Sequence, residues 1–254
     1  MRLQGKVAVI TGAGSGMGYA MSVLFAREGA KIVAGEWNET SLAKVVADVK
    51  AAGGEIKGVK INVANKAEAE SLVDAAVKAY GRIDILCNNA GVMDLNQGAA
   101  ELTDEMWERV LGINLNGPMY LTRKAIPVML QGGGGSIINI ASVAGLGGGS
   151  AGLAYTVSKH GLVGLTLNTA YRYGPEGIRC NAIAAGAVET NIVASVDTSK
   201  MDPKGSARAQ VYYGLIPLTL KAGDIANLAL FLASDESVHI NGAIIPADGG
   251  WRSA

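Results

Sequence analysis

Residues 7–18 read Val-Ala-Val-Ile-Thr-Gly-Ala-Gly-Ser-Gly-Met-Gly, a short apolar run that leads directly into glycines. An uninterrupted apolar run of this length is typical of a parallel strand that is buried on both faces. Residues from about 16 to 28 are predicted to form a helix. A glycine-rich turn between a buried strand and a helix indicates phosphate binding, because the bare backbone lets N–H groups reach a pyrophosphate at the positive end of the helix dipole.

The glycines follow the spacing T-G-x-x-x-G-x-G from Thr11 to Gly18, which differs from the G-x-G-x-x-G pattern. The backbone chemistry is the same for both spacings, and Gly18 would allow the helix to pack closely on the strand. An ordinary tight turn is the alternative interpretation. We expect this turn to bind a dinucleotide cofactor through Gly12, Ser15, Gly16, Met17 and Gly18.

Strand and helix patterns alternate along the rest of the chain. Further strands are predicted at residues 31–35, 56–61, 83–87, 137–140, 178–183 and 243–246. Helices are predicted at residues 41–51, 66–80, 103–130 with a break near Gly117-Pro118, 154–173, and around 228–232. This alternation is typical of an α/β protein with a Rossmann-type doubly wound parallel sheet and helices on both faces. We expect residues 1–254 to form a single domain, with a substrate loop or lid at about residues 190–215.

Composition argues against several kinds of partner. The 22 basic and 22 acidic residues give a formal net charge of zero without blocks of like charge, so neither nucleic acid nor an anionic membrane is expected. Two histidines without a Cys/His/Asp cluster argue against a catalytic metal. Cys87 and Cys180 fall in predicted strands, so we expect buried, reduced thiols. Without a signal sequence or a membrane-spanning apolar run, the expected location is the cytoplasm.

Glu36 ends the second predicted strand, 18 residues after Gly18. An acid at this place accepts hydrogen bonds from a ribose diol and repels a 2′-phosphate. Its neighbours Ser15, Trp37 and Asn38 are not basic, so the sequence favours NAD over NADP. Trp37 either lines the adenine pocket or caps the core.

Two further turns follow predicted strands and offer cofactor contacts. Asn62 and Val63 come after the third strand, where a short polar side chain meets an adenine or merely caps the strand end. Asn88-Asn89-Ala90-Gly91 follows the fourth strand, and its small residues permit close backbone approach in the crevice at the carboxyl ends of the strands. We expect Asn89, Ala90 and Gly91 to contact the cofactor.

Tyr155 and Lys159 are four residues apart in the longest predicted helix and so share one of its faces. A phenol has a pKa near about 10, and a fixed ammonium beside it favours the phenolate. Such a pair can give a proton to a carbonyl oxygen or take one from an alcohol. Two solvated positions on a helix face are the alternative.

Together these motifs resemble the classical short-chain dehydrogenase/reductase family. The resemblance covers essentially the whole chain, and the motifs stand in the family's order: the Thr11–Gly18 turn, Asn88–Gly91, Asn114, Ser142, and Tyr155 with Lys159. It implies a Rossmann-type sheet of about seven strands, a nicotinamide cofactor and redox chemistry between carbonyl and alcohol.

The resemblance also implies roles for four catalytic residues. Tyr155 would be the general acid/base, and Lys159 would lower its pKa and hold the ribose hydroxyls. Ser142 would bind the substrate oxygen, and Asn114 would bind a water that links Lys159 to solvent. A strand-end cap at Ser142 and a helix kink at Asn114 are the alternatives.

Two positions depart from the family pattern. Ala185-Gly186 stands where the family usually has Pro-Gly, which would leave the loop below the nicotinamide less rigid. Gly186, Val188 and Thr190 still match the residues expected to contact the cofactor. Asn62 stands where the family often has Asp, and an amide brings no charge to the adenine.

Substrate contacts are expected from Met93-Asp94 and from residues 143–153 and 191–215. We expect a small-molecule substrate, an uncharged or weakly polar secondary alcohol or ketone. A sugar, as in glucose dehydrogenases, or a 3-oxoacyl thioester remains open, and a non-catalytic dinucleotide-sensing module is the alternative of another class. The helix around Tyr155 is apolar nearly all round, which predicts a subunit interface, and the family suggests a homotetramer. Burial of this helix within one chain is the alternative.

Overall fold

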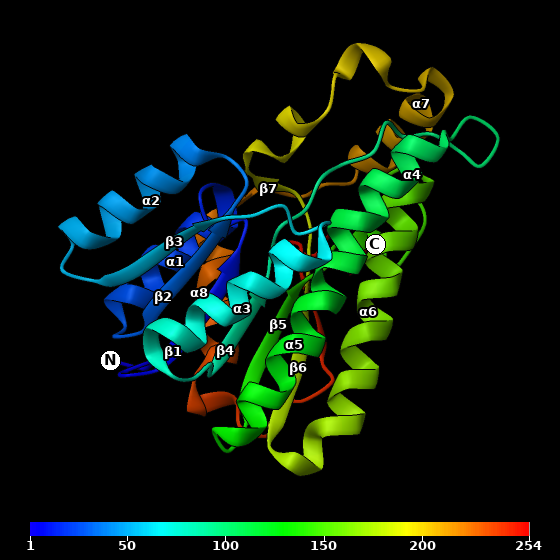
Figure 1. Ribbon diagram of the computed structural model, residues 1–254. Helices are drawn as coiled ribbons and strands as arrows, with labels where there is room; N and C mark the ends of the chain where they lie inside the picture. The colour runs from blue at the N-terminus through cyan, green and yellow to red at the C-terminus, as the bar shows by residue number, and fades with distance from the viewer. Residues whose placement is uncertain (254) are drawn as a thin grey trace.

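The computed structural model describes residues 1–253 and confirms the predicted α/β architecture (Figure 1). A seven-stranded sheet has the order β3-β2-β1-β4-β5-β6-β9, and every pair of neighbours is parallel. The sequence therefore predicted all seven strands. Their bounds are β1 Val7–Thr11, β2 Lys31–Glu36, β3 Glu55–Lys60, β4 Ile85–Asn88, β5 Gly135–Ile140, β6 Ile178–Ala185 and β9 Ile244–Ala247.

Helices cover both faces of the sheet (Figure 1). Ala8 and Ile10 of β1 face a core formed with α1 Gly16–Arg27, α2 Glu39–Ala51 and α8 Ala222–Ala233. Val7 and Val9 face the opposite core, formed with α3 Lys66–Tyr80, α5 Gly117–Gln131 and α6 Leu153–Tyr173. The continuous apolar run of β1 is thus explained, because each of its faces meets a helical layer.

The expected break near Gly117-Pro118 is corrected by the structure. Helix α4 (Asp104–Leu111) passes into α5 through a π-helical turn, η1, at Gly112–Asn116. Pro118 lies in the first turn of α5, where its missing N–H is tolerated. The π turn widens the helix locally, so the chain stays helical from α4 through to α5.

The segment from 190 to 215 is more ordered than a loop. It contains α7 (Pro203–Tyr213), and it follows β7 (Val188–Glu189), which pairs with β8 (Leu220–Lys221) in a small second sheet. Asp202 caps α7 by accepting from the Gly205 N–H. An Asp followed by Pro is typical of a helix start. The sequence therefore contained a signal for α7, but we did not predict this helix.

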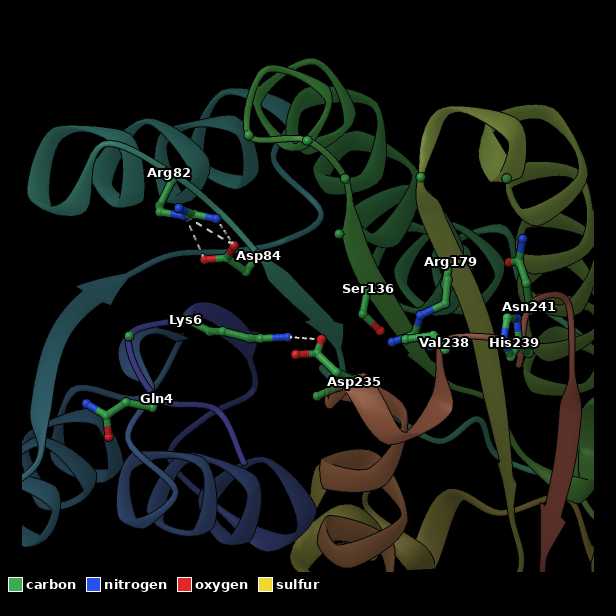
Figure 2. A pocket seen from close by; sticks show the side chains of 18 residues that line it. Gln4, Lys6, Arg82, Asp84, Ser136, Arg179, Asp235, Val238, His239 and Asn241 are labelled. Atoms are coloured by element: carbon green, nitrogen blue, oxygen red, sulfur yellow. Dashed lines mark hydrogen bonds and ion pairs between the residues drawn. The ribbon is translucent and has the colours of Figure 1, made fainter. Parts of the chain in front are cut away.

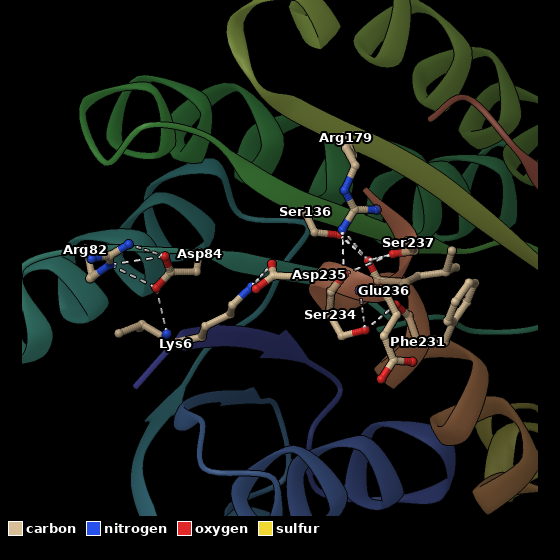
Figure 3. A network of polar contacts seen from close by, with 12 residues as sticks. Lys6, Arg82, Asp84, Ser136, Arg179, Phe231, Ser234, Asp235, Glu236 and Ser237 are labelled. Atoms are coloured by element: carbon tan, nitrogen blue, oxygen red, sulfur yellow. Dashed lines mark hydrogen bonds and ion pairs between the residues drawn. The ribbon is translucent and has the colours of Figure 1, made fainter. Parts of the chain in front are cut away.

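The amino-terminal edge of the sheet has a cavity of about 670 Å³ (Figure 2). The charged side chains around this cavity are paired with other groups of the protein (Figure 3). Lys6 pairs with Asp235, and Arg179 donates to the carbonyls of Leu232 and Ser234. Asp84 accepts from the Val7 N–H at 2.8 Å. The Lys6 and Arg179 contacts tie β1 and β6 to the end of α8 and the residues after it, and the Asp84 contact ties β1 to the start of β4, so we assign this edge a structural role.

Both cysteines are buried and free, as predicted. Burial raises the pKa of the Cys180 thiol to about 12, and raises that of Cys87 further. Among residues 1–253, no helix has the length and apolarity needed to cross a bilayer.

Candidate active site

The glycine-rich turn lies at the carboxyl edge of the sheet, between β1 and α1. Gly12 and Gly16 have φ angles of 61° and 49°, a region that residues with side chains rarely adopt. A Cβ at Gly18 would collide with the Gly12 carbonyl oxygen. The turn therefore requires glycine for its backbone conformation and for the close approach of α1.

Thr11 joins this turn to the Asn88–Gly91 motif. Its hydroxyl accepts from the N–H groups of Asn89 at 3.0 Å and Ala90 at 3.1 Å. The Asn89 amide donates in return to the carbonyls of Thr11 at 2.9 Å and Gly12 at 3.2 Å. The structure thus brings two of the predicted cofactor motifs together, through a residue that we had not singled out. Its place as the first letter of the T-G-x-x-x-G-x-G pattern was the available signal.

Glu36 lies beside the same turn. One carboxylate oxygen accepts from the Gly14 N–H and the other from the Asn38 N–H, both at 3.0 Å. Trp37 is 66% exposed, so it does not cap the core and the adenine-side interpretation of this residue is retained. Glu36, which we predict to bind the ribose hydroxyls, is therefore fixed next to the glycine-rich turn that we predict to bind the phosphates.

Asn62 and Val63 serve the local structure. The Asn62 side-chain oxygen accepts from the Ala64 N–H at 3.0 Å, which is the strand-end turn considered as the alternative. Val63 is buried against Gly117. The contact of this pair with an adenine stays a prediction.

The segment after β6 returns to the glycine turn. The Gly186 N–H donates to the Ala247 carbonyl, and a Cβ at Gly186 would lie 2.7 Å from Asp248 Cα. Thr190 packs so closely on Gly16 that a Cβ there would lie 3.1 Å from Thr190 Cγ2. Thr190 is therefore held against the predicted cofactor turn and Gly186 against the end of β9, with Val188 between them in β7, without the usual proline.

Tyr155 and Lys159 lie in the first two turns of α6, and both are buried. Lys159 Nζ donates to the Ile140 carbonyl at 2.8 Å and lies 5.5 Å from the centre of the Tyr155 ring. Ser142 follows β5 and accepts from the Ala144 N–H at 3.1 Å, so it is a local cap as well as a neighbour of the phenol. Solvated positions on a helix face are thereby excluded for the pair.

The expected lowering of the Tyr155 pKa by Lys159 is not seen in the protein alone. Burial raises the pKa of Tyr155 to about 12, a hydrogen bond with Ser142 opposes the rise, and the charges of Asp94 and Tyr213 add to it. Burial also lowers the pKa of Lys159 to about 8. The physical reason is that a low-dielectric site disfavours the charged form of each group.

Asn114 is fully buried in the π-helical turn. Its side chain accepts from the Val92 N–H and donates to the Val92 carbonyl, both at 2.9 Å, and also donates to Ser158 Oγ at 3.2 Å. A Cβ on Gly91 would lie 3.5 Å from Asn114 Oδ1 and 3.6 Å from Lys159 Nζ. The structure therefore places Asn114 near Lys159 as a clamp between a loop and α6, and the water relay stays a prediction.

Comparison with known proteins agrees with this geometry. A family model described as enoyl-(acyl carrier protein) reductase matches residues 12–252. The chain is 42% identical to 3beta-hydroxysteroid dehydrogenase 2 of Eggerthella lenta over 99% of this chain and 96% of that protein. It is 37% identical to a 3-oxoacyl-[acyl-carrier-protein] reductase of Thermotoga maritima over 98% and 99%. The chain belongs to the classical short-chain dehydrogenase/reductase family.

Solved structures of similar proteins extend the comparison. Levodione reductase superposes with a TM-score of 0.91 at 35% identity, over 100% of both chains. A gluconate 5-dehydrogenase of Beutenbergia cavernae, described as putative and solved with NADP, has a TM-score of 0.86 at 33% identity over 99% of this chain and 98% of that one. Family membership makes the protein an oxidoreductase that acts on CH–OH groups, in a family that binds nicotinamide dinucleotides.

In this dehydrogenase/reductase, two further residues lie beside Tyr155. Asp94, which we expected on a substrate loop, is fully buried and accepts from three backbone N–H groups. Tyr213 of α7 donates to the Ser150 carbonyl at 3.1 Å. The positions of Asp94 and Tyr213 could not be predicted from the sequence, because both depend on contacts between segments about 60 residues apart.

Helix α7 forms an aromatic wall with the end of the chain. The rings of Tyr212 and Trp251 lie 4.7 Å apart, and Trp251 Nε1 donates to the Tyr212 carbonyl. A hollow of about 580 Å³ lies between α7 and residues from the segments 96–99 and 148–153. Lys204 and Arg208 of α7 are exposed.

Proposed function

We propose that this enzyme interconverts a secondary alcohol and a ketone with NAD(H), using Tyr155 as the general acid/base. The observation that carries the proposal is the burial of Tyr155 and Lys159 beside Ser142, at the edge of the sheet that also holds the glycine-rich turn. A titratable pair in such a site has perturbed pKa values, which is typical of acid/base catalysis.

The side chains divide the proton chemistry between them. With a pKa of about 12, Tyr155 keeps its proton at neutral pH and can donate it to a carbonyl oxygen. Ser142 supports the same oxygen by a hydrogen bond. In the direction of alcohol oxidation, the protonated Lys159 ammonium favours the Tyr155 phenolate, which takes the proton of the alcohol. Asn114 orders the loop at Gly91 beside Lys159.

The residues present fit a nicotinamide dinucleotide. Gly12 and Gly16 leave the backbone of the turn without side chains at these two positions, with φ angles of 61° and 49°. One of the three Lys159 N–H groups binds Ile140, so two can hold ribose hydroxyls. When bound, the cofactor supplies or accepts the hydride. We propose NAD rather than NADP, because an acid that ends the second strand, as Glu36 does, accepts hydrogen bonds from a ribose diol and repels a 2′-phosphate.

The proposed substrate is an uncharged or weakly polar alicyclic alcohol or ketone. The names of two similar proteins, a 3beta-hydroxysteroid dehydrogenase and levodione reductase, support this class. The similar 3-oxoacyl-[acyl-carrier-protein] reductase and the putative gluconate 5-dehydrogenase favour a thioester or a sugar acid as the second candidate. The apolar and aromatic character of Tyr212, Tyr213 and Trp251 favours the first.

We further propose a cytoplasmic homotetramer assembled through the outer face of α6. Leu167 is half-exposed there and Tyr171 is 86% exposed, and because they are four residues apart they lie on one face of the helix, where a second subunit would cover both.

The test follows nicotinamide absorbance with a panel of alicyclic alcohols and ketones, sugar acids and 3-oxoacyl thioesters, each with NAD and NADP. Turnover with NAD on an alicyclic alcohol or ketone supports the proposal, and preference for NADP or for a thioester contradicts it. The Tyr155→Phe variant is the control for mechanism. It should lose about 10²- to 10⁴-fold in kcat and still bind NADH, whereas parental turnover would exclude Tyr155 as the acid/base.

A further inference from the structure

Helix α6, which carries Tyr155, has no capping side chain of its own. Its N-cap residue is Gly152, which has no side chain with which to cap the first turn. The first four N–H groups of a helix need partners, and a buried helix end without them is costly. Here the partner comes from another part of the chain, the loop after β4.

Asp94 supplies the missing cap. Its Oδ1 accepts from the N–H groups of Gly152 and Asn96, both at 3.1 Å, and its Oδ2 accepts from the Tyr155 N–H at 2.9 Å. The carboxylate is 0% exposed, and a Cβ on Gly152 would lie 2.6 Å from Oδ2. The lack of a side chain at 152 is therefore what gives Asp94 room.

We propose that Asp94 is a positioning residue for the reaction: its buried carboxylate fixes the first turn of α6 and, through the backbone N–H of Tyr155, the place of the Tyr155 phenol. The inference rests on the proposed role of Tyr155. It goes beyond that role because it assigns the alignment of the phenol to a residue 61 positions away in the sequence.

The geometry requires a carboxylate rather than an amide. Three N–H donors converge on Asp94, and a carboxylate has an acceptor for each. An Asn at 94 keeps one oxygen, which would continue to serve Gly152 and Asn96. Its NH₂ group would then face the Tyr155 N–H, donor against donor. The hydrogen bond that the amide cannot make is therefore the one to the catalytic residue.

The negative charge acts on the phenol as well. Two titratable groups face Asp94: Tyr155 of α6 and Tyr213 of α7, and the charge of Asp94 raises the pKa of both. Lys159, one helical turn beyond Tyr155, is the cation near that phenol. Removing the charge of Asp94 should therefore favour the Tyr155 phenolate.

The same loop also contacts α7 and the residue that caps it. The Asp202 N–H donates to the Leu95 carbonyl at 2.8 Å, and the Asn96 amide donates to Ser206 Oγ at 3.3 Å. A Cβ on Gly205 would collide with the Asn96 carbonyl oxygen. The loop that positions Tyr155 is thus bonded to the first turn of α7.

The test compares Asp94→Asn with Asp84→Asn in the complete enzyme. Asp84 also accepts from a backbone N–H, that of Val7, but at the opposite edge of the sheet, so its variant controls for lost stability alone. The measurements are kcat for alcohol oxidation against pH, the dissociation constant for NADH by fluorescence, and the melting temperature.

Asp94→Asn should lower kcat by about 10- to 100-fold, with NADH affinity changed much less. The pH midpoint of alcohol oxidation should move to lower pH, because a negative charge that opposed the phenolate is gone. Asp84→Asn should lose stability without moving the midpoint. Parental kcat in Asp94→Asn, or a loss of kcat with an unmoved midpoint, would overturn the proposal.

Gly152→Ala gives a second route if Asp94→Asn does not fold. Its methyl group would displace the carboxylate and keep the charge, so kcat should fall while the midpoint does not drop; parental kcat would again overturn the proposal. Tyr155→Phe separates the two claims: if Tyr155→Phe keeps parental turnover, the proposed function fails, whereas a fall in Tyr155→Phe without one in Asp94→Asn refutes only the positioning role.

Discussion

Lys159 should destabilise the fold at neutral pH, and replacing it with Met should stabilise the enzyme without bound cofactor. Burial lowers the Lys159 pKa from 10.5 to about 8. That difference corresponds to about 3 kcal/mol lost by holding the ammonium protonated inside the protein at pH 7. The hydrogen bond to Ile140 returns about 1 kcal/mol, so Lys159→Met should gain about 2 kcal/mol. For a chain of this size the melting temperature should rise by about 4–8 °C.

The sign of the pH dependence gives a sharper test. The folded state binds fewer protons than the unfolded state between the lowered pKa of about 8 and the ordinary lysine pKa of 10.5. Stability of the parent enzyme therefore rises with pH across this window, and the advantage of Lys159→Met shrinks. Denaturant titrations at several pH values measure both, with Lys50→Met, an exposed lysine of α2, as the control. A parent enzyme that is as stable as Lys159→Met at pH 7, or a gap that does not close above pH 8, would refute the reasoning.

Three further outcomes follow from the structure. Gly18→Ala should lower stability by about 1–3 kcal/mol and weaken NADH binding, because the methyl group meets the Gly12 carbonyl; Gly223→Ala in α8, with open space around it, should do neither. Glu36→Gln should raise kcat/KM for NADP relative to NAD by about tenfold, and an unchanged ratio would show that Glu36 does not select the cofactor. Tyr171→Glu on the outer face of α6 should dissociate the proposed tetramer in sedimentation, whereas an intact tetramer would place the interface elsewhere.

The strands could be predicted because a strand that is buried on both faces has a continuous apolar sequence. Val7 to Ile10 are all apolar, since each faces one of the two helical layers. Helix α7 was missed because its sequence is polar and exposed, and its start at Asp202-Pro203 was the one local sign of it. The break expected near Pro118 was wrong, because a π-helical turn accommodates the proline at a helix start.

The sequence by itself determined the order of strands and helices, the glycine turn and the residue types that the chemistry needs. Those features depend on local spacing: Tyr155 and Lys159 share a helix face whatever surrounds them. Only the tertiary structure decided their protonation, since the pKa values depend on how deeply both are buried. It also decided that Asp94 caps the helix of Tyr155, because that contact joins residues 61 positions apart. Local pattern fixes the identity of a site, whereas its electrostatics and alignment arise from packing between distant segments.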